Sequence, residues 1–194
     1  MEKGYVQVYT GNGKGKTTAA IGLAIRALGA GKKVLMIQFM KSPSYSEHNL
    51  LQKISANFCI ENIGKPFFIA EEGSISPEDL EKLKGKVEVF SPGQPPEEYI
   101  QLSQKGVDMA KHAVSCGDYD LVILDELNVA LHFGLIQWEQ VETILHAKAP
   151  HVELVITGRN APQELIDRAD LVTEMREIKH YYAQGVIARK GIEN

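Results

Sequence analysis

A glycine- and lysine-rich segment near the N-terminus constrains the fold of this 194-residue chain more than any other feature of the sequence. Residues 10–18 read Thr-Gly-Asn-Gly-Lys-Gly-Lys-Thr-Thr, between a strand-like run at residues 5–9 and a helix-like stretch at residues 17–28. Glycines let the backbone turn tightly and direct several N–H groups at one anion, and the following helix adds a partial positive charge at its N-terminus. The segment therefore predicts a phosphate-binding loop at the start of an α/β domain.

The side chains of this loop suit the triphosphate of a nucleotide. Lys16 can reach phosphate oxygens, and the Thr17 hydroxyl can bind Mg²⁺. The usual pattern has glycine where this chain has Thr10, and Lys14 adds a second cation. The alternative is a turn that binds nothing, but two lysines in one loop repel each other unless an anion lies between them. The expected nucleotide-binding residues of the loop are Gly11, Asn12, Gly13, Lys14, Gly15, Lys16, Thr17 and Thr18.

A second part of the site is expected where an apolar run ends in two carboxylates. Residues 121–124 are Leu-Val-Ile-Leu, and Asp125 and Glu126 follow them directly. Because ligands of parallel α/β sheets bind at the carboxyl ends of the strands, one of these carboxylates can hold Mg²⁺ directly or through water. The alternative is that the two residues cap the next helix.

Short β-branched runs alternate with longer amphipathic stretches, which predicts an α/β fold with a mainly parallel sheet of about six strands and helices on both faces. The expected strands are residues 5–9, 34–38, 58–63, 121–124, 153–157 and 171–174. The expected helices are residues 17–28, 97–115, 137–147 and 162–168. Residues 41–47 are expected to form a polar loop, and residues 176–194 a polar tail with several glycines.

Residues 64–94 contain scattered glycines and prolines, which predict a loop-rich excursion with one short helix near residues 77–83. We expect this excursion to belong to a single P-loop domain that spans residues 1–194.

Composition narrows the functional classes. The net charge of -4 argues against sequence-independent binding of nucleic acid through a basic surface. No apolar run is long enough to span a bilayer, and the first residues lead straight into a strand without room for a secretory signal, so a cytoplasmic location is expected. Cys59 and Cys116 do not suggest a disulfide framework, and the six histidines show no spacing typical of a zinc site.

Several further segments extend the pattern of the loop along the chain. They are residues 9–20, 38–41 (Gln-Phe-Met-Lys), 124–127 (Leu-Asp-Glu-Leu) and 157–159 (Thr-Gly-Arg), and the tail residues Asp170, Glu174, Lys179, His180, Gly191 and Ile192. In this order, and with threonine at the first loop position, they resemble the Walker-type corrinoid adenosyltransferases, which include ATP:cob(I)alamin and cob(I)yrinic acid a,c-diamide adenosyltransferases.

The resemblance implies transfer of the 5′-deoxyadenosyl group of ATP to the Co(I) centre of a reduced corrinoid, with release of triphosphate. The corrinoid would be cobalamin, cobinamide or cobyrinic acid diamide, in adenosylcobalamin synthesis or salvage. The family binds ATP in reverse along the loop. Carried over to this sequence, Lys16, Lys14 and Glu126 are expected to be catalytic, and Thr17 and Glu126 to hold Mg²⁺ or Mn²⁺. Asp125 and Arg159 are expected to support the nucleotide site. A homodimer and a flavoprotein reductant are also implied.

Two departures from the family affect the corrinoid side. Better-known members line the lower corrinoid face with a Gly-Phe-x-Trp motif, whereas this chain reads Gly-Lys-Pro-Phe-Phe at residues 64–68. Phe67 and Phe68 are the expected substitutes, and core filling is their alternative. The chain also begins close to its first strand, without the polar N-terminal extension of some members, so closure is expected from residues 64–94 or from a partner subunit.

Two other functions fit the loop. A generic P-loop ATPase or kinase could use Glu126 to position a water molecule, and would release ADP. A non-catalytic module would bind ATP or a corrinoid without turnover.

Overall fold

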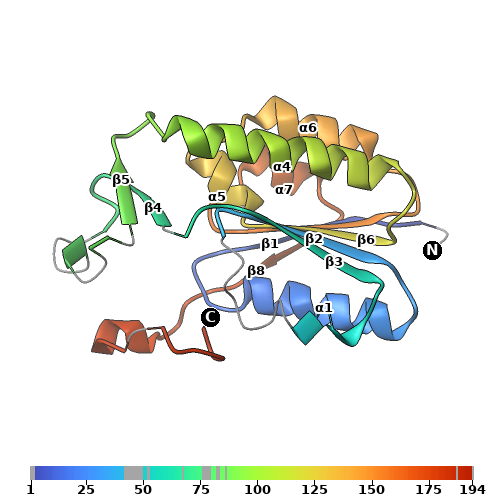
Figure 1. Ribbon diagram of the computed structural model, residues 1–194, viewed down its shortest axis with the longest axis horizontal. Helices are drawn as coiled ribbons and strands as arrows, with labels where there is room; N and C mark the ends of the chain where they lie inside the picture. The colour runs from blue at the N-terminus through green and yellow to red at the C-terminus, as the bar shows by residue number, and fades with distance from the viewer. Residues whose placement is uncertain are drawn as a thin grey trace.

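A six-stranded parallel sheet forms the centre of the computed structural model, with helices on both faces (Figure 1). The structure describes residues 3–41, 50–51, 53–66, 68–75, 80–81, 84–85, 87–186 and 188–193. The strands are β1 (Val6–Thr10), β2 (Val34–Phe39), β3 (Phe58–Ile63), β6 (Leu121–Asp125), β7 (Glu153–Thr157) and β8 (Leu171–Glu174). Their order across the sheet is β3-β2-β6-β7-β1-β8, and every neighbouring pair is parallel. The expected α/β architecture is confirmed.

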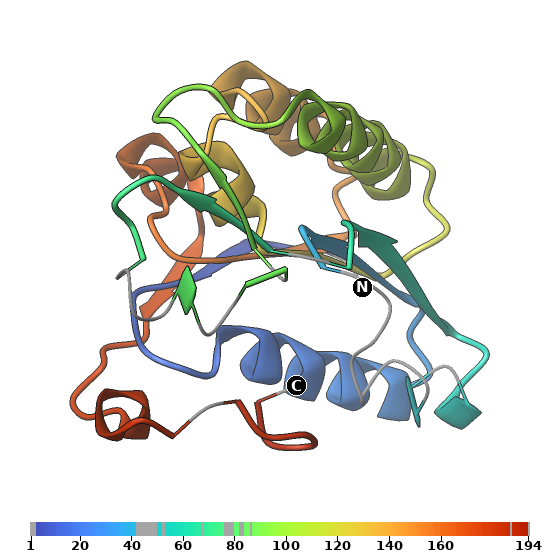
Figure 2. The ribbon, with the colours of Figure 1, turned by 60° about the vertical axis from the view of Figure 1, so that its left-hand side comes forward.

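The helices form two layers around this sheet. They are α1 (Lys16–Gly29), α4 (Glu97–Ser115), α5 (Leu127–His132), α6 (Trp138–Ala147) and α7 (Gln163–Arg168), and a 3-10 helix, η1 (Tyr181–Gln184), lies in the tail. Helix α1 covers one face of the sheet, while α4, α5, α6 and α7 cover the other (Figures 1 and 2). The tail lies on the side of α1 (Figure 2). In the described part of the chain, no helix is long and apolar enough to cross a membrane.

The neighbouring strands β2 and β6 are apolar except for Gln38 and Asp125 near their carboxyl ends, because both of their faces are covered. Every residue of β2 and of β6 is buried. Alternate side chains of these strands belong to two apolar clusters: Met36 and Ile123 lie in the cluster beneath α1, whereas Ile37 and Leu124 lie in the larger cluster beneath α4 and α6. Strands that are buried on both sides lose the polar alternation of an exposed sheet, which is why they appear in the sequence as continuous apolar runs.

The region at residues 64–94 differs from the expected loop. It contains a second sheet of two parallel strands, β4 (Phe68–Glu71) and β5 (Val87–Phe90), which projects beside the N-terminal end of α4 (Figure 1). Ile69 and Phe90 belong to the main apolar cluster, and the Phe90 ring packs edge-on against Phe133 at a centroid distance of 5.5 Å. These two strands lie among scattered glycines and prolines, which favour a loop in the sequence. The short helix expected near residues 77–83 lies mostly outside the described residues, and the loop expected at residues 41–47 does so except at Lys41.

Helix α5 was not expected either. Its six residues begin directly after Glu126, without the proline that marks the start of the equally short α7. Helices α6 and α7 begin one residue later than expected. Gln137 caps α6 through reciprocal hydrogen bonds with Gln140, and Pro162 occupies the capping position of α7.

The packing of α4 on the sheet generates a stability prediction. A Cβ atom on Gly106 of α4 would lie 2.7 Å from Cε1 of the fully buried Phe39 ring. Gly106→Ala should therefore lower the free energy of unfolding by about 1–3 kcal/mol, measured by urea denaturation. The matched control is Gly22→Ala on α1, where a Cβ meets nothing within 4 Å; it should raise stability by about 0.5–1 kcal/mol. Equal behaviour of the two variants would contradict the close approach of α4.

Candidate active site

The loop between β1 and α1, residues 11–15, is shaped by close contact with the chain that follows β8. Gly11 and Gly15 have left-handed backbones, with φ of 92° and 119°. A side chain at Gly11 would clash with the carbonyl oxygen of Met175, and a Cβ on Gly13 would lie 2.8 Å from the same atom. The Gly13 N–H donates a 2.7 Å hydrogen bond to that oxygen. Glycine is therefore required at these positions for steric reasons. We call residues 11–15 the glycine-rich loop.

Thr10, which stands where the usual loop pattern has glycine, has a structural role. It is the last residue of β1 and is buried. Its Oγ1 accepts a 3.3 Å hydrogen bond from the Ala161 N–H. A side chain is accommodated here because Thr10 still has strand conformation and the tight turn begins at Gly11.

The Lys16 side chain occupies the centre of the glycine-rich loop. It is 7% exposed, and its Nζ donates hydrogen bonds to the carbonyl oxygens of Gly11 (2.7 Å) and Gly13 (2.8 Å). Burial lowers the pKa of Lys16, and the nearby Glu126 carboxylate partly opposes that effect. A partly desolvated cation in a ring of backbone groups interacts strongly with an anion that enters the loop.

Asp125, at the end of β6, joins four elements through its fully buried carboxylate. Its Oδ1 accepts hydrogen bonds from the hydroxyls of Thr17 (2.8 Å) and Thr157 (2.6 Å). Its Oδ2 accepts from Gln38 Nε2 (2.9 Å) and from Lys41 Nζ (2.6 Å). Burial alone would raise the pKa of Asp125, but the charge of Lys41 and these hydrogen bonds outweigh burial and lower it. Asp125 is therefore ionised and fixed in place.

Glu126 follows Asp125 but has a different environment. Its backbone is left-handed, with φ of 60°, and its N–H donates to Thr157 Oγ1 at 3.1 Å. Its half-buried side chain lines a cavity in front of the glycine-rich loop. Burial raises the pKa of Glu126, and the adjacent Asp125 charge raises it further. Two neighbouring carboxylates with opposite pKa shifts indicate separate roles.

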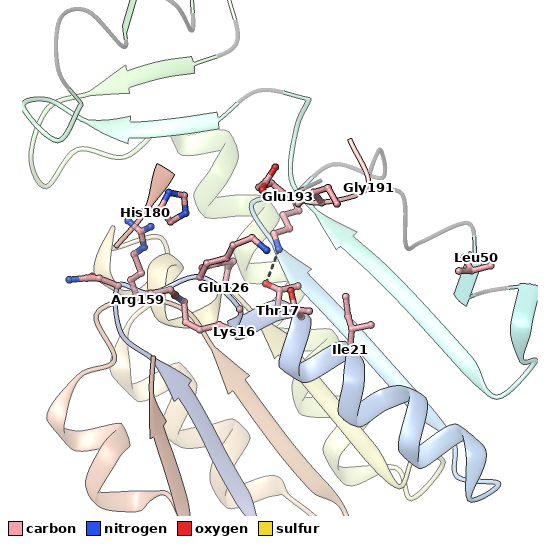
Figure 3. Close-up of a pocket in the computed structure, with 16 residues that line it drawn as sticks. Lys16, Thr17, Ile21, Leu50, Glu126, Arg159, His180, Gly191 and Glu193 are labelled. Atoms are coloured by element: carbon pink, nitrogen blue, oxygen red, sulfur yellow. Dashed lines mark hydrogen bonds between the residues drawn. The ribbon is translucent and has the colours of Figure 1, made fainter. Parts of the chain in front are cut away.

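The cavity has a volume of about 650 Å³, and Figure 3 shows Lys16, Glu126 and Arg159 directed toward it. Its lining combines the loop, the start of α1 and the C-terminal tail. The lining residues are Asn12, Gly13, Lys14, Gly15, Lys16, Thr17, Thr18, Ile21, Lys41, Leu50, Glu126, Arg159, His180, Gly191, Ile192 and Glu193. Nearly all residues expected from the sequence to bind the nucleotide thus lie around one cavity; the exception is Gly11, whose carbonyl binds Lys16.

The structure does not describe the side chains that are expected to contact the corrinoid. It does show further residues that hold the site together. Phe67 lies outside the described residues, and Phe68 is described only as the first backbone position of β4. Sequence reasoning assigned no role to Gln38, Lys41 or Thr157, all of which hold Asp125. A signal was present for Gln38 and Thr157, since each is a polar residue within or at the end of an apolar strand.

The tail also contributes to the cavity. Glu193 accepts hydrogen bonds from the Tyr181 hydroxyl and from the Arg189 side chain, which closes the tail on itself beside the loop. Side-chain contacts of this kind within a polar, glycine-containing tail have no sequence period that would predict them.

The donor atoms at this site fit a magnesium ion bound with a nucleotide. The Thr17 hydroxyl and the Asp125 and Glu126 carboxylates are hard oxygen donors, as Mg²⁺ prefers. Within the described ranges, no group of three or more His, Cys, Asp or Glu side chains could hold a metal. Mg²⁺ at nucleotide sites commonly takes only one or two protein oxygens, and phosphates and water supply the others.

The opposite pKa shifts of the two carboxylates predict opposite effects on stability. A carboxyl group whose pKa is raised by folding destabilises the protein once the pH exceeds its unfolded pKa, about 4.3. Glu126→Gln should therefore raise the free energy of unfolding at pH 7 by roughly 1 kcal/mol in the absence of nucleotide. The gain should vanish as the pH falls through about 4.

The adjacent variant Asp125→Asn is the matched comparison. It removes the countercharge of Lys41 and should lower stability at pH 7 by roughly 3 kcal/mol. Urea denaturation at pH 7 and pH 4 measures both variants. A loss of stability in Glu126→Gln at pH 7 would contradict the environment described for Glu126.

Comparison with known proteins gives matches over almost the whole chain. The sequence model of a family described as "ATP:corrinoid adenosyltransferase BtuR/CobO/CobP" matches residues 2–194. The chain is 33% identical over 193 residues to the corrinoid adenosyltransferase CobA of Salmonella typhimurium, covering 99% of this chain and 86% of that protein. It is 32% identical over 194 residues to a corrinoid adenosyltransferase of Sinorhizobium sp., covering 99% and 81%.

One relative is much longer. The chain is 32% identical over 187 residues to the uncharacterized protein all2391 of Nostoc sp., which covers 91% of this chain but only 45% of that protein. The chain therefore spans less than half the length of this relative.

Proposed function

Because the chain belongs to the ATP:corrinoid adenosyltransferase family, we propose that it transfers the 5′-deoxyadenosyl group of ATP to the Co(I) centre of a reduced corrinoid and releases triphosphate. The observation that carries this proposal is the family match over residues 2–194, which includes every residue that lines the cavity. The substrate would be cobalamin, cobinamide or cobyrinic acid diamide, in adenosylcobalamin synthesis or salvage. The protein is then a transferase and neither a kinase nor an ATPase.

The proposed reaction needs stabilisation of a departing triphosphate. The electron pair of Co(I) forms the bond to C5′ of the ribose while the C5′–O bond breaks, and the electrons of that bond leave with the triphosphate. Negative charge grows on the oxygen that leaves C5′. The backbone N–H groups of the glycine-rich loop other than that of Gly13, which is bonded to Met175, would bind the triphosphate oxygens together with Lys16 and Lys14. On this proposal, Lys16 exchanges its carbonyl partners for phosphate oxygens.

The metal side of the site would consist of Thr17 and Glu126, with Asp125 as the residue that orients the Thr17 hydroxyl. A bound Mg²⁺ or Mn²⁺ would neutralise phosphate charge. The raised pKa of Glu126 suits this role, because a cation nearby would favour the ionised form of its carboxylate. Arg159, which lines the same cavity, would supply a further positive charge to the nucleotide.

The corrinoid would bind toward the lobe formed by β4 and β5. The packing of Ile69 and Phe90 into the main core supports the view that residues 64–94 belong to one domain spanning residues 1–194. We propose Phe67 and Phe68 as the aromatic residues of the lower corrinoid face. A homodimer, a flavoprotein reductant and a cytoplasmic location complete the proposal.

The reaction is tested with ATP, Mg²⁺ and chemically reduced cobalamin, followed through the visible spectrum. A light-sensitive cobalt–carbon product and an equal amount of triphosphate are expected. Lys16→Ala should lower the rate by at least about a hundredfold, because it removes a charge that stabilises the leaving group. The control is Lys111→Ala, which removes an exposed lysine of α4 and should leave the rate unchanged.

Two outcomes would overturn the proposal. Release of ADP and phosphate, independent of corrinoid, would identify an ATPase or kinase. Adenosylation that survives Lys16→Ala would contradict the assignment of the loop. Repetition with cobinamide measures substrate breadth.

A further inference from the structure

Two lysine–aspartate ion pairs lie at opposite ends of the neighbouring strands β2 and β6. At the amino ends, Lys32 Nζ lies 3.2 Å from Asp120; at the carboxyl ends, Lys41 Nζ lies 2.6 Å from Asp125. The first pair is at the surface, with side chains 33% and 24% exposed. The second is largely inside the protein, at 15% and 0%. Loss of one partner from an interior pair of this kind strongly destabilises a protein, because the other charge stays buried without compensation. A role in solubility therefore does not explain the second pair.

The Lys41 ammonium contacts the same side chains that would form the metal side of the nucleotide site. Besides Asp125 Oδ2, its Nζ lies 3.3 Å from Thr17 Oγ1, the hydroxyl proposed to bind the metal ion. A lysine ammonium and a divalent cation repel each other at such distances. A metal ion that binds the Thr17 hydroxyl therefore requires the Lys41 ammonium to move.

The backbone at Lys41 is fixed, so only the side chain can make this movement. Met40 has a left-handed backbone, with φ of 57°, and its N–H donates a 2.6 Å hydrogen bond to Ile63. Gly64 packs so closely that a Cβ there would lie 2.5 Å from the Lys41 nitrogen. The lysine side chain is long and flexible, and it also lines the cavity in front of the glycine-rich loop.

We propose that Lys41 is a positioning residue that takes the place of the metal ion in the nucleotide-free enzyme and makes metal binding depend on ATP. Its ammonium neutralises the buried Asp125 and donates to the Thr17 hydroxyl oxygen that would bind the metal ion. A metal ion alone must displace this cation from its ion pair with Asp125 and brings no negative charge in exchange. A metal ion that arrives with ATP brings phosphate oxygens into the same cavity, and the displaced ammonium can bind them.

This proposal has a thermodynamic consequence. If the ammonium and the metal ion compete, ATP and the metal ion each strengthen the binding of the other. Removal of the Lys41 charge should weaken that coupling by strengthening the binding of metal alone. The inference rests on the proposed nucleotide site, but it does not depend on transfer to a corrinoid.

The test is direct binding of Mn²⁺ to the nucleotide-free protein, measured by electron paramagnetic resonance of the free ion. Wild-type protein should bind Mn²⁺ weakly, and Lys41→Met should bind it at least about tenfold more tightly, because a competing charge is gone. Lys41→Gln, which keeps a hydrogen-bond donor, should behave in the same way. Lys41→Arg keeps the charge and should resemble the wild type.

The matched control is Lys32→Met, which breaks the equivalent ion pair at the opposite end of β2 and β6 and should leave Mn²⁺ binding unchanged. A second measurement is the melting temperature. Mg²⁺ without ATP should raise it in Lys41→Met more than in the wild type.

Unchanged Mn²⁺ affinity in both neutral variants would overturn the proposal, as would equal gains in Lys41→Met and Lys32→Met. Neither measurement involves a corrinoid. Failure of this inference therefore leaves the adenosyltransferase assay unaffected, and failure of that assay leaves the binding results valid.

Discussion

The geometry of the site depends on the hydrogen bonds and the ion pair of the buried Asp125 carboxylate. A charge removed from water is stable only when partners surround it, and here they come from β2, β7, α1 and the residue Lys41 after β2. Strand register delivers the first of them, since Gln38 and Asp125 are paired positions of β2 and β6. A slip of one residue would turn either side chain to the other face of the sheet. The geometry of the site around this ionised group therefore depends on the order and register of the strands.

The glycine-rich loop depends on distant parts of the chain in the same way. Its turn is held against Met175, and the residue before it, Thr10, binds the backbone after β7 through Ala161. The loop is thus fixed by segments about 150 residues away in the sequence. Such contacts hold backbone groups in position before a ligand arrives, and a preorganised site spends less free energy on reorganisation.

The parts of the fold that could be predicted are those with long or continuous apolar patterns. The spans 58–63, 97–115, 153–157 and 171–174 match the strands and the helix of the structure residue for residue. The short elements β4, β5 and α5 could not be found, because glycines and prolines surround β4 and β5 and no start signal separates α5 from β6. The loop and the two carboxylates could be named from sequence. The network of Gln38, Lys41 and Thr157 around Asp125 could not, since it exists only once the strands lie in register.

The neighbouring carboxylates have different environments because the backbone changes conformation between them. Asp125 is still in β6 and directs its side chain into the protein, whereas Glu126 has a left-handed backbone and lines the cavity. A non-glycine residue in this conformation is uncommon and carries strain. The left-handed backbone at Glu126 ends the strand after Asp125, whose carboxylate is buried and neutralised. The carboxylate of Glu126 is left incompletely compensated beside the loop, where a cation would lower its free energy most.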